Sequence, residues 1–373
     1  MASKPQVRFA PLFTITPAIA RALMRIEAAR QAVLTLPVTP RVLARLRETA
    51  RLFTTHYSTM IEGNRLTQEQ VAQVIVSGQH FPGRERDQYE VKGYYAALDE
   101  VENLTARGER LAEAAVRRLH ALVMGGGRWR VKPTPYRDGQ NVIRDSRSNS
   151  IVYLPPEAKD VPQLMEQLIA WLNAGGKTGE ELPVPIKAAI AHYQYATIHP
   201  YFDGNGRTAR LLTTLILHLG GYGLKGLYAL EEYYARNLGE YYTALTIGPS
   251  HNYYLGRAEA DITGWIAYFI EGMADSFERV KELTLIEAKV GVADLSAQLR
   301  NLDARQRKVL ALFEKSRELT AKEIGDLFGY RPRTASELCR RWVEQGFLEV
   351  ADAAKKSRRY RLASPYEDMV GKR

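Results

Sequence analysis

The residues best suited to chemistry in this chain are twelve consecutive ones, from His199 to Arg210. They contain a histidine, a carboxylate, an asparagine between two glycines, and two arginines. Histidine titrates near neutral pH and can take a proton from a hydroxyl group. Arginine side chains and glycine-flanked backbone N–H groups bind phosphate oxygens. Together these residue types indicate an enzyme that binds a metal-chelated polyphosphate and removes a proton beside it.

Helices are expected on both sides of this segment. Apolar residues recur at helical spacing over 185–198 and over 207–219, and the second set is apolar enough for a buried helix. Residues 203–206 then precede a helix N-terminus, where free N–H groups and the helix dipole favour an anion. Arg207 and Arg210 lie three apart and share one helix face.

Each of these features alone also has an ordinary structural explanation. A single histidine at a helix end usually caps the helix or packs in the core. Asn-Gly usually forms a turn, and two nearby arginines usually form a solvated face. The complete ordered string favours a catalytic site over these alternatives.

The twelve residues fit the pattern His-Pro-(Phe/Tyr)-x-(Asp/Glu)-Gly-Asn-Gly-Arg-x-x-Arg at each fixed position. On these residues the chain resembles the Fic (filamentation induced by cAMP) family. The resemblance implies a mainly α fold, with a Fic-type helical core and a small β-hairpin flap. It also implies AMPylation, the transfer of AMP from ATP with Mg²⁺ to a Ser, Thr or Tyr hydroxyl of a target protein.

The same resemblance assigns roles to individual residues. It makes His199 the general base and Asp203 the ligand of the metal on the α- and β-phosphates. Tyr241 or Tyr242 is a candidate for contact with adenine, and packing in the core is the alternative for either. The residues expected to hold the phosphates are Gly204, Asn205, Gly206, Arg207 and, at the γ-phosphate, Arg210.

A second resemblance lies on a helix expected over about 40–62. Members of one regulatory class carry (Ser/Thr)-x-x-x-Glu-(Gly/Asn), and Ser58 to Gly63 fit this pattern. A carboxylate beside Arg210 would pair with it and displace the γ-phosphate, which would make Glu62 an intramolecular inhibitor. The alternative is an ordinary exposed glutamate before a helix-ending glycine.

Two short runs of β-type residues, 140–143 and 151–154, predict a hairpin within residues 137–154. Its edge could pair with an extended stretch of a target and present a hydroxyl to His199. Ile143 and Val152 are the residues expected to dock the target. The family often has Ile-Gly-Gly at the strand tip, whereas this chain has Ile143-Arg144-Asp145, a difference that bears on target selection.

The C-terminal part of the chain is strongly basic. Residues 301–373 contain 17 Lys/Arg and 11 Asp/Glu, and so account for more than half of the formal net charge of +10. Helices over 303–315, from Thr320 and over 333–345, followed by strands over 346–350 and 358–362, resemble a winged helix-turn-helix domain. Candidate DNA contacts are Arg333, Arg340, Arg341, Lys355 and Arg358. Because winged helices also dock proteins or form dimers, and Glu337 and Glu344 dilute the charge, DNA binding stays open.

The length suits two or three domains. The resemblances divide the chain into an N-terminal helical region (1–110), a catalytic core (111–290) and the winged helix (300–363). The single cysteine, Cys339, cannot form an internal disulfide. The chain has no run of 18 apolar residues and no secretory signal, so a cytoplasmic protein without a membrane partner is expected.

Several alternatives remain open at this stage. The chain could be a DNA-binding regulator that senses a nucleotide without transfer, or a de-AMPylase in which Glu62 positions water. A homodimer and self-modification are further options for a protein of this kind. The target protein and its modified residue do not follow from the sequence.

Overall fold

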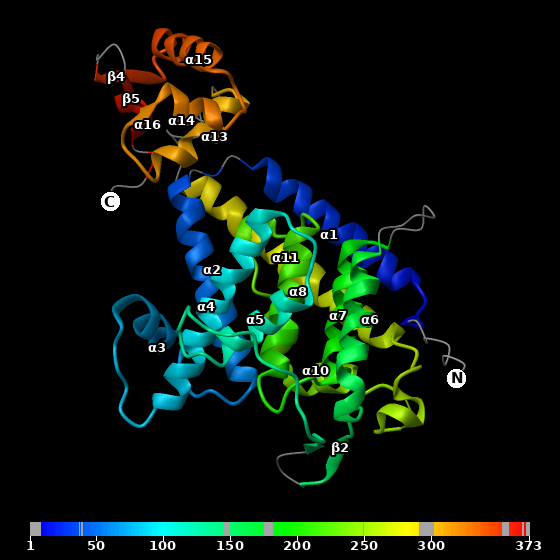
Figure 1. Ribbon diagram of the computed structural model, residues 1–373. Helices are drawn as coiled ribbons and strands as arrows, with labels where there is room; N and C mark the ends of the chain where they lie inside the picture. Colours follow the sequence, from blue (N-terminus) through cyan, green and yellow to red (C-terminus); the bar gives the residue numbers. More distant parts are fainter. Residues whose placement is uncertain are drawn as a thin grey trace, which may run out of the picture. The chain divides into compact units, whose positions relative to one another are not determined.

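The computed structural model describes residues 9–36, 38, 40–144, 149–174, 182–248, 250–290, 302–352, 358–367 and 369–370. The protein is mainly helical (Figure 1). Its contacts form two compact units, Met1–Gln31 with Thr49–Val280 and Ala32–Glu48 with Lys281–Arg373. The predicted boundaries near residues 110 and 300 stay predictions. Asp145 and Lys355 lie outside the described residues.

The α-helices up to residue 290 carry the active-site loop and its surroundings. In chain order they are α1 (Pro17–Thr35), α2 (Pro40–Ile61), α3 (Gln68–Ala72), α4 (Glu85–Arg107), α5 (Glu113–Val123), α6 (Val161–Asn173), α7 (Val184–Ile198), α8 (Asn205–Leu219), α9 (Leu230–Arg236), α10 (Leu238–Leu245) and α11 (Thr263–Val290). Short helical turns are η1 (Gln73–Ser77), η2 (Ala158–Asp160), η3 (Leu224–Gly226) and η4 (Tyr253–Arg257).

Local residue types explain where several of these helices begin and end. A capping box begins α3: the Thr67 hydroxyl accepts from the Gln70 N–H, and the Gln70 side chain accepts from the Thr67 N–H. Helix α2 ends before Gly63, whose φ of 91° suits glycine. Helix α11 begins at Thr263, where the Asp261 carboxylate accepts from the Thr263 N–H.

The two central helices, α7 and α8, form the best-packed pair of the first unit (Figure 1). Nearly every residue of α7 is buried, which is why it shows little amphipathic pattern. The apolar side of α8, including Leu211, Leu212 and Leu215, packs in the same hydrophobic cluster as residues of α4, α5 and α6. This packing fixes the short loop that joins α7 to α8.

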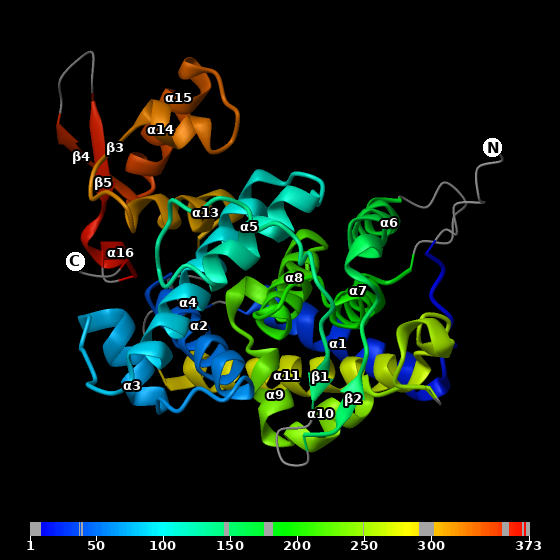
Figure 2. The ribbon, with the colours of Figure 1, turned by 60° about the horizontal axis from the view of Figure 1, so that its bottom comes forward.

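The predicted hairpin is present but shorter than expected. Strands β1 (Ile143–Arg144) and β2 (Ile151–Tyr153) pair antiparallel and lie below α7 in Figure 2. The predicted first strand began at Gln140, but Gln140 instead donates to the Pro155 carbonyl, and Asn141 donates to the Tyr201 carbonyl. These side chains bind the segment before β1 to the backbone after β2 and to the 199–204 loop, and the β1–β2 pairing does not extend to residues 140–142.

The second unit combines short helices with a small antiparallel sheet, whose strand order is β3–β5–β4. Its elements are α13 (Ala304–Phe313), β3 (Leu319–Thr320), α14 (Ala321–Asp326), α15 (Pro332–Glu344), β4 (Leu348–Asp352), β5 (Arg359–Leu362) and α16 (Ser364–Glu367). The helix expected from Thr320 is present and begins with a capping box between Thr320 and Glu323. Cys339 is buried beside Trp342 in the core of this unit, and burial raises the pKa of its thiol to about 12.

In the part of the chain that the structure describes, no helix has the length and apolar content needed to cross a membrane.

Candidate active site

The loop between α7 and α8 begins at His199, which ends α7 in a left-handed conformation with φ 51°. The ring Nδ1 lies 3.3 Å from the Ala196 carbonyl oxygen. A carbonyl can only accept, so Nδ1 carries the hydrogen and Nε2 keeps its lone pair. Burial lowers the pKa of His199 to about 4. The side chain is therefore neutral at physiological pH, with Nε2 ready to accept a proton.

Asp203 is the most exposed ionisable group of this loop, with 57% of its side chain accessible. Its Oδ1 accepts from the Gly204 N–H at 2.6 Å and from Arg207 Nη2 at 3.1 Å. Within the described residues Oδ2 accepts no hydrogen bond. No three His, Cys, Asp or Glu side chains converge as metal ligands in the same part of the chain. A lone outward carboxylate fits Mg²⁺, which usually keeps waters and takes phosphate oxygens as further ligands.

The start of α8 is open to an anion because residues 204 and 206 lack side chains. Gly204 has φ 76°, and a Cβ there would lie 3.0 Å from Met124 Sδ. A Cβ on Gly206 would lie only 2.2 Å from Oε1 of Glu62. The Glu62 carboxylate thus lies against the first turn of α8, the place where the sequence predicted phosphate.

Asn205, one of the residues expected to hold phosphate, uses its side chain within the loop. Its Oδ1 accepts from the Tyr201 N–H at 3.0 Å, and its Nδ2 donates to the Tyr201 carbonyl at 2.7 Å. The buried side chain therefore closes the loop onto itself. The same contacts let α8 begin at Asn205, two residues before the predicted start at Arg207.

Arg207 is buried and already faces two carboxylates. Its Nη2 bonds Asp203, and its Nη1 lies 3.9 Å from Oε1 of the buried Glu90. Glu90 in turn accepts from Asn64 and Arg86. The guanidinium of Arg207 thus lies between Asp203 and Glu90 at the start of α8.

Arg210 is also buried, and residues of α2 and its C-terminal flank surround its guanidinium. Nη2 donates to Glu62 Oε1 at 2.8 Å and to the Ser58 carbonyl at 2.9 Å, while Nε donates to Ser58 Oγ at 2.7 Å. Burial opposes the charge, but the neighbouring Glu62 outweighs it, so the pKa of Arg210 is raised. The Glu62 side chain is 29% exposed. A buried cation is thus paired with a carboxylate that still reaches solvent.

The two candidate tyrosines lie in different environments. Tyr241 is buried, stacks on Tyr234 with ring centroids 4.7 Å apart, and bonds His192 Nε2 at 3.0 Å. The structure therefore favours the packing alternative for Tyr241. Tyr242 is 47% exposed and its hydroxyl lies 3.3 Å from the Ile61 carbonyl, beside Glu62. Of the two, Tyr242 is the one that a nucleotide could reach.

The hairpin residues expected to dock a target lie near the same loop. Ile143 and Val152 are half-buried, whereas Arg144 and Ile151 are exposed. The Tyr153 hydroxyl donates to the Thr197 carbonyl at 2.7 Å and so fixes the hairpin to the last turn of α7. Exposed Phe202 lies next to Gly139, at the start of the hairpin segment.

Two buried side chains of this region have no counterpart in the sequence prediction. His120 on α5 donates from Nε2 to the Asp203 carbonyl at 2.8 Å and stacks on Tyr201 at 3.6 Å. Burial lowers the pKa of His120 to about 4, so it is a neutral support of the loop. Arg137 donates to the carbonyl of His199 itself at 2.9 Å. Neither belongs to a recognisable motif, because each acts on residues more than sixty positions away.

The basic residues proposed for DNA contact lie in the second unit. Arg333, Arg340, Arg341 and Arg358 are all exposed. Arg333 pairs with Glu337 at 3.3 Å and Arg340 with Glu344 at 3.8 Å, both along α15. These pairs offset part of the positive charge on that helix face.

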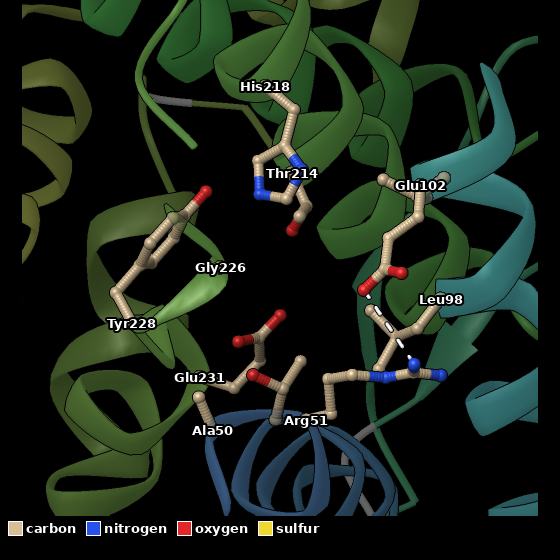
Figure 3. A pocket seen from close by; sticks show the side chains of 11 residues that line it. Ala50, Arg51, Leu98, Glu102, Thr214, His218, Gly226, Tyr228 and Glu231 are labelled. Atoms are coloured by element: carbon tan, nitrogen blue, oxygen red, sulfur yellow. Dashed lines mark ion pairs between the residues drawn. The ribbon is translucent and has the colours of Figure 1, made fainter. Parts of the chain in front are cut away.

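A small cavity of about 30 Å³ lies elsewhere in the first unit (Figure 3). It is bordered by Glu231, His218, Tyr228, Thr214 and the Arg51–Glu102 ion pair. Burial raises the pKa of Glu231, and Tyr94 donates to its carboxyl group at 3.2 Å. The volume suits a few water molecules, so this cavity is not the nucleotide site.

Comparison with known proteins gives a family match to the segment that contains this loop. The model of the Fic/DOC family fits residues 110–217, which include α5, the hairpin, α7 and most of α8. Residues 110–217 form a Fic domain. The string 199–210 therefore lies near the end of the matched segment, where His199 ends α7 and α8 begins at Asn205.

Curated relatives include the protein adenylyltransferase fic-1 of Caenorhabditis elegans, 30% identical over 230 residues. The alignment covers 59% of this chain and 42% of that protein. The protein adenylyltransferase Fic of Aedes aegypti is 29% identical over 201 residues, with 53% and 38% covered. The chain thus aligns with less than half the length of each relative.

Among solved structures, a Fic family protein from Desulfovibrio desulfuricans G20 has a TM-score of 0.59 and 25% identity. The structural alignment covers 98% of this chain and 100% of that protein's chain. Fic-1 of Caenorhabditis elegans, at 23% identity and a TM-score of 0.54, shares the fold over 72% of this chain. The Fic domain and the helices around it therefore have a known architecture.

Proposed function

We propose that the protein is a protein adenylyltransferase, which transfers AMP from ATP to a Ser, Thr or Tyr hydroxyl of a target. One observation carries the proposal: neutral His199, whose Nε2 has no hydrogen bond to the described residues, lies in the loop that leads to the open first turn of α8. The curated relatives named protein adenylyltransferase agree with it. The family match covers residues 110–217, and we propose this activity for the whole chain.

In this mechanism His199 Nε2 removes the proton of the target hydroxyl. The hydroxyl oxygen then bonds to the α-phosphorus of ATP, and the bond from that phosphorus to the bridging oxygen of pyrophosphate breaks. The N–H groups at the start of α8, with Arg207 and Arg210, stabilise the negative charge of the phosphates. The protein supplies position and charge, which are the main requirements of phosphoryl chemistry.

Asp203 would hold the Mg²⁺ that ATP brings, and the ion would neutralise charge on the phosphates. Its outward Oδ2 suits this role, and the neighbouring N–H of Gly204 holds the other oxygen. Tyr242 is the proposed contact for adenine, because its ring is exposed beside Glu62.

We further propose that Glu62 inhibits the enzyme. Its carboxylate pairs with Arg210, the residue proposed to bind the γ-phosphate, and lies against Gly206. Two anions cannot share one guanidinium and one helix N-terminus at full strength, so ATP must displace Glu62 to bind productively. Ser58, in the last turn of α2, also holds Arg210, since its Oγ accepts from Arg210 Nε.

The experiment is intact-mass spectrometry after incubation with Mg²⁺ and ATP. The samples are the wild type, Glu62→Gly, and Glu62→Gly with His199→Ala. A strong AMP-sized gain in Glu62→Gly that disappears with His199→Ala supports the transfer, its base and its inhibitor. If Glu62→Gly gains no mass with or without added candidate targets, adenylyl transfer is the wrong reaction.

For residues 300–363 we propose a winged helix-turn-helix, since helices α13 to α15 and the β3–β5–β4 sheet follow the order expected for it. A DNA-binding regulator that only senses nucleotide remains the second candidate function. The exposed arginines of α15 support it, and their pairing with Glu337 and Glu344 counts against it. Salt-dependent binding of a DNA duplex, lost on Arg333→Ala with Arg340→Ala, separates the two.

A further inference from the structure

Arg137 lies between α5 and the hairpin, and it is a buried cation without a paired anion. Only 4% of the residue is exposed, and it forms no ion pair with the described residues. All three of its nitrogens donate to main-chain carbonyls: Nε to His199 at 2.9 Å, Nη1 to Gly139 at 2.9 Å, and Nη2 to Pro156 at 2.5 Å.

These three carbonyls belong to three distinct parts of the site. Gly139 precedes strand β1, Pro156 follows strand β2, and His199 is the proposed base. The Arg137 N–H also donates to the Pro200 carbonyl at 3.0 Å. One residue therefore joins both ends of the hairpin to the loop that holds the base.

Arginine is the side chain suited to this arrangement. Its planar guanidinium presents donors in a fixed fork, so three carbonyls bound to it have fixed relative positions. A buried charge without a carboxylate is costly to fold, and burial lowers the pKa of Arg137. An apolar side chain would fill the same space without this cost, which indicates that the geometry of the three bonds matters.

We propose that Arg137 is a positioning residue that sets the distance between the hairpin and His199. A hydroxyl on a protein segment paired with the hairpin then meets Nε2 of the base. This inference rests on the adenylyltransferase function proposed above. It assigns Arg137 no contact with ATP, because the bonds of its guanidinium are directed to the hairpin ends and to the loop backbone.

The test uses the full chain with Glu62→Gly as the parent and self-transfer of AMP, measured by intact mass, as the reaction. Arg137→Met removes the three bonds, and Arg137→Lys keeps the charge but not the fork. Arg117→Met is the matched control, because Arg117 is half-buried and also donates to a backbone carbonyl, that of Thr134. Within the described residues, Arg117 makes no hydrogen bond to strands β1 and β2 or to the 199–204 loop.

We expect Arg137→Met to lower kcat by about 100-fold, the effect of a small misplacement of reacting groups, with the KM for ATP nearly unchanged. Arg137→Lys should recover part of the rate, and Arg117→Met should behave as the parent. A parallel rise in the KM for ATP, or an equal loss in Arg117→Met, would overturn the positioning role.

A second readout does not depend on activity. Amide hydrogen exchange of Arg137→Met should speed up in strands β1 and β2 and over residues 199–202, while the interior of α8 stays protected. Unchanged exchange in the hairpin, or equal loss of protection in α8, would also overturn the inference. If the Glu62→Gly parent transfers nothing, the proposed function fails, and the exchange result still decides whether Arg137 couples hairpin and loop.

Discussion

At the scale of single residues, the missing side chain of Gly206 decides what can approach α8. A methyl group there would collide with the Glu62 carboxylate, and by the same geometry with any phosphate oxygen in its place. The backbone of Gly206 has no positive φ. Glycine is therefore needed at this position for space and not for conformational freedom.

This leads to a prediction for Gly206→Ala. The substitution should displace Glu62 from Arg210 and yet fail to activate the protein, because the methyl group also blocks the phosphate. Measured by intact mass, transfer should be at least about 100-fold below that of Glu62→Gly, in line with the loss of oriented phosphate contacts. Adding Gly206→Ala to Glu62→Gly should remove its activity, and full transfer in that double variant would contradict the steric argument.

The state of His199 gives a second prediction at the residue scale. Since burial lowers its pKa to about 4, the neutral base persists well below the usual histidine range. In Glu62→Gly, transfer should stay nearly constant from pH 7 to about 5 and fall only as the pH approaches about 4. An acidic decline centred near pH 6.5 would show that the ring titrates as an ordinary exposed histidine.

At the scale of elements, His192 joins three helices in the core. From α7 its Nδ1–H donates to Thr213 of α8, because the Thr213 hydroxyl already donates to the Ala209 carbonyl. Its Nε2 then accepts from the Tyr241 hydroxyl of α10. Burial lowers the pKa of His192 to about 3, so these bonds require the neutral ring.

The third prediction follows from this buried ring. Between pH 6.5 and about 3 the unfolded chain binds a proton at His192 and the folded protein does not, so stability falls as the pH falls. The expected loss from His192 is about 1.4 kcal/mol for each pH unit below 6.5, and the buried His120 and His199 add to it. Urea unfolding at pH 7 and pH 5 measures the total pH dependence, and His192→Gln should reduce it by the share of His192. An unchanged slope in that variant would assign the effect to other groups.

Local signals explain which elements could be predicted from the sequence. Thr67, Thr320 and Gly63 act on neighbours within a few residues, so the capping boxes and the end of α2 were predictable. Helix α1 was missed, although Pro17 follows Thr16, whose hydroxyl accepts from the Ile19 N–H. The hairpin was predicted too long, since the partner of Asn141 is sixty residues away.

The site shows the same difference between signals from neighbouring residues and contacts between distant ones. The 199–210 string identified the loop and its two arginines, because the motif is contiguous. The roles of His120, Arg137 and the Asn205 side chain were not predictable, since they depend on how the chain brings distant backbone groups together. Whether Tyr241 or Tyr242 is exposed likewise depends on the packing of α10.

At the scale of the whole molecule, the inhibitory contact joins residues 148 positions apart in the chain. Glu62 follows the last residue of α2, and Gly63 follows Glu62. The end of a helix opens with less free energy than its interior or the whole fold. Releasing Arg210 therefore requires only the last turn of α2 to loosen.

If Glu62 inhibits as proposed, its position at the end of α2 predicts that the inhibition weakens on warming. As the wild type is warmed below its melting temperature, the share of molecules with a frayed α2 end should grow, and transfer should rise more steeply than in Glu62→Gly. Rates measured at several temperatures on both proteins check this, and parallel curves would contradict it. A single glutamate at a helix end would then make the protein a sensor of heat, with no further domain needed for the response.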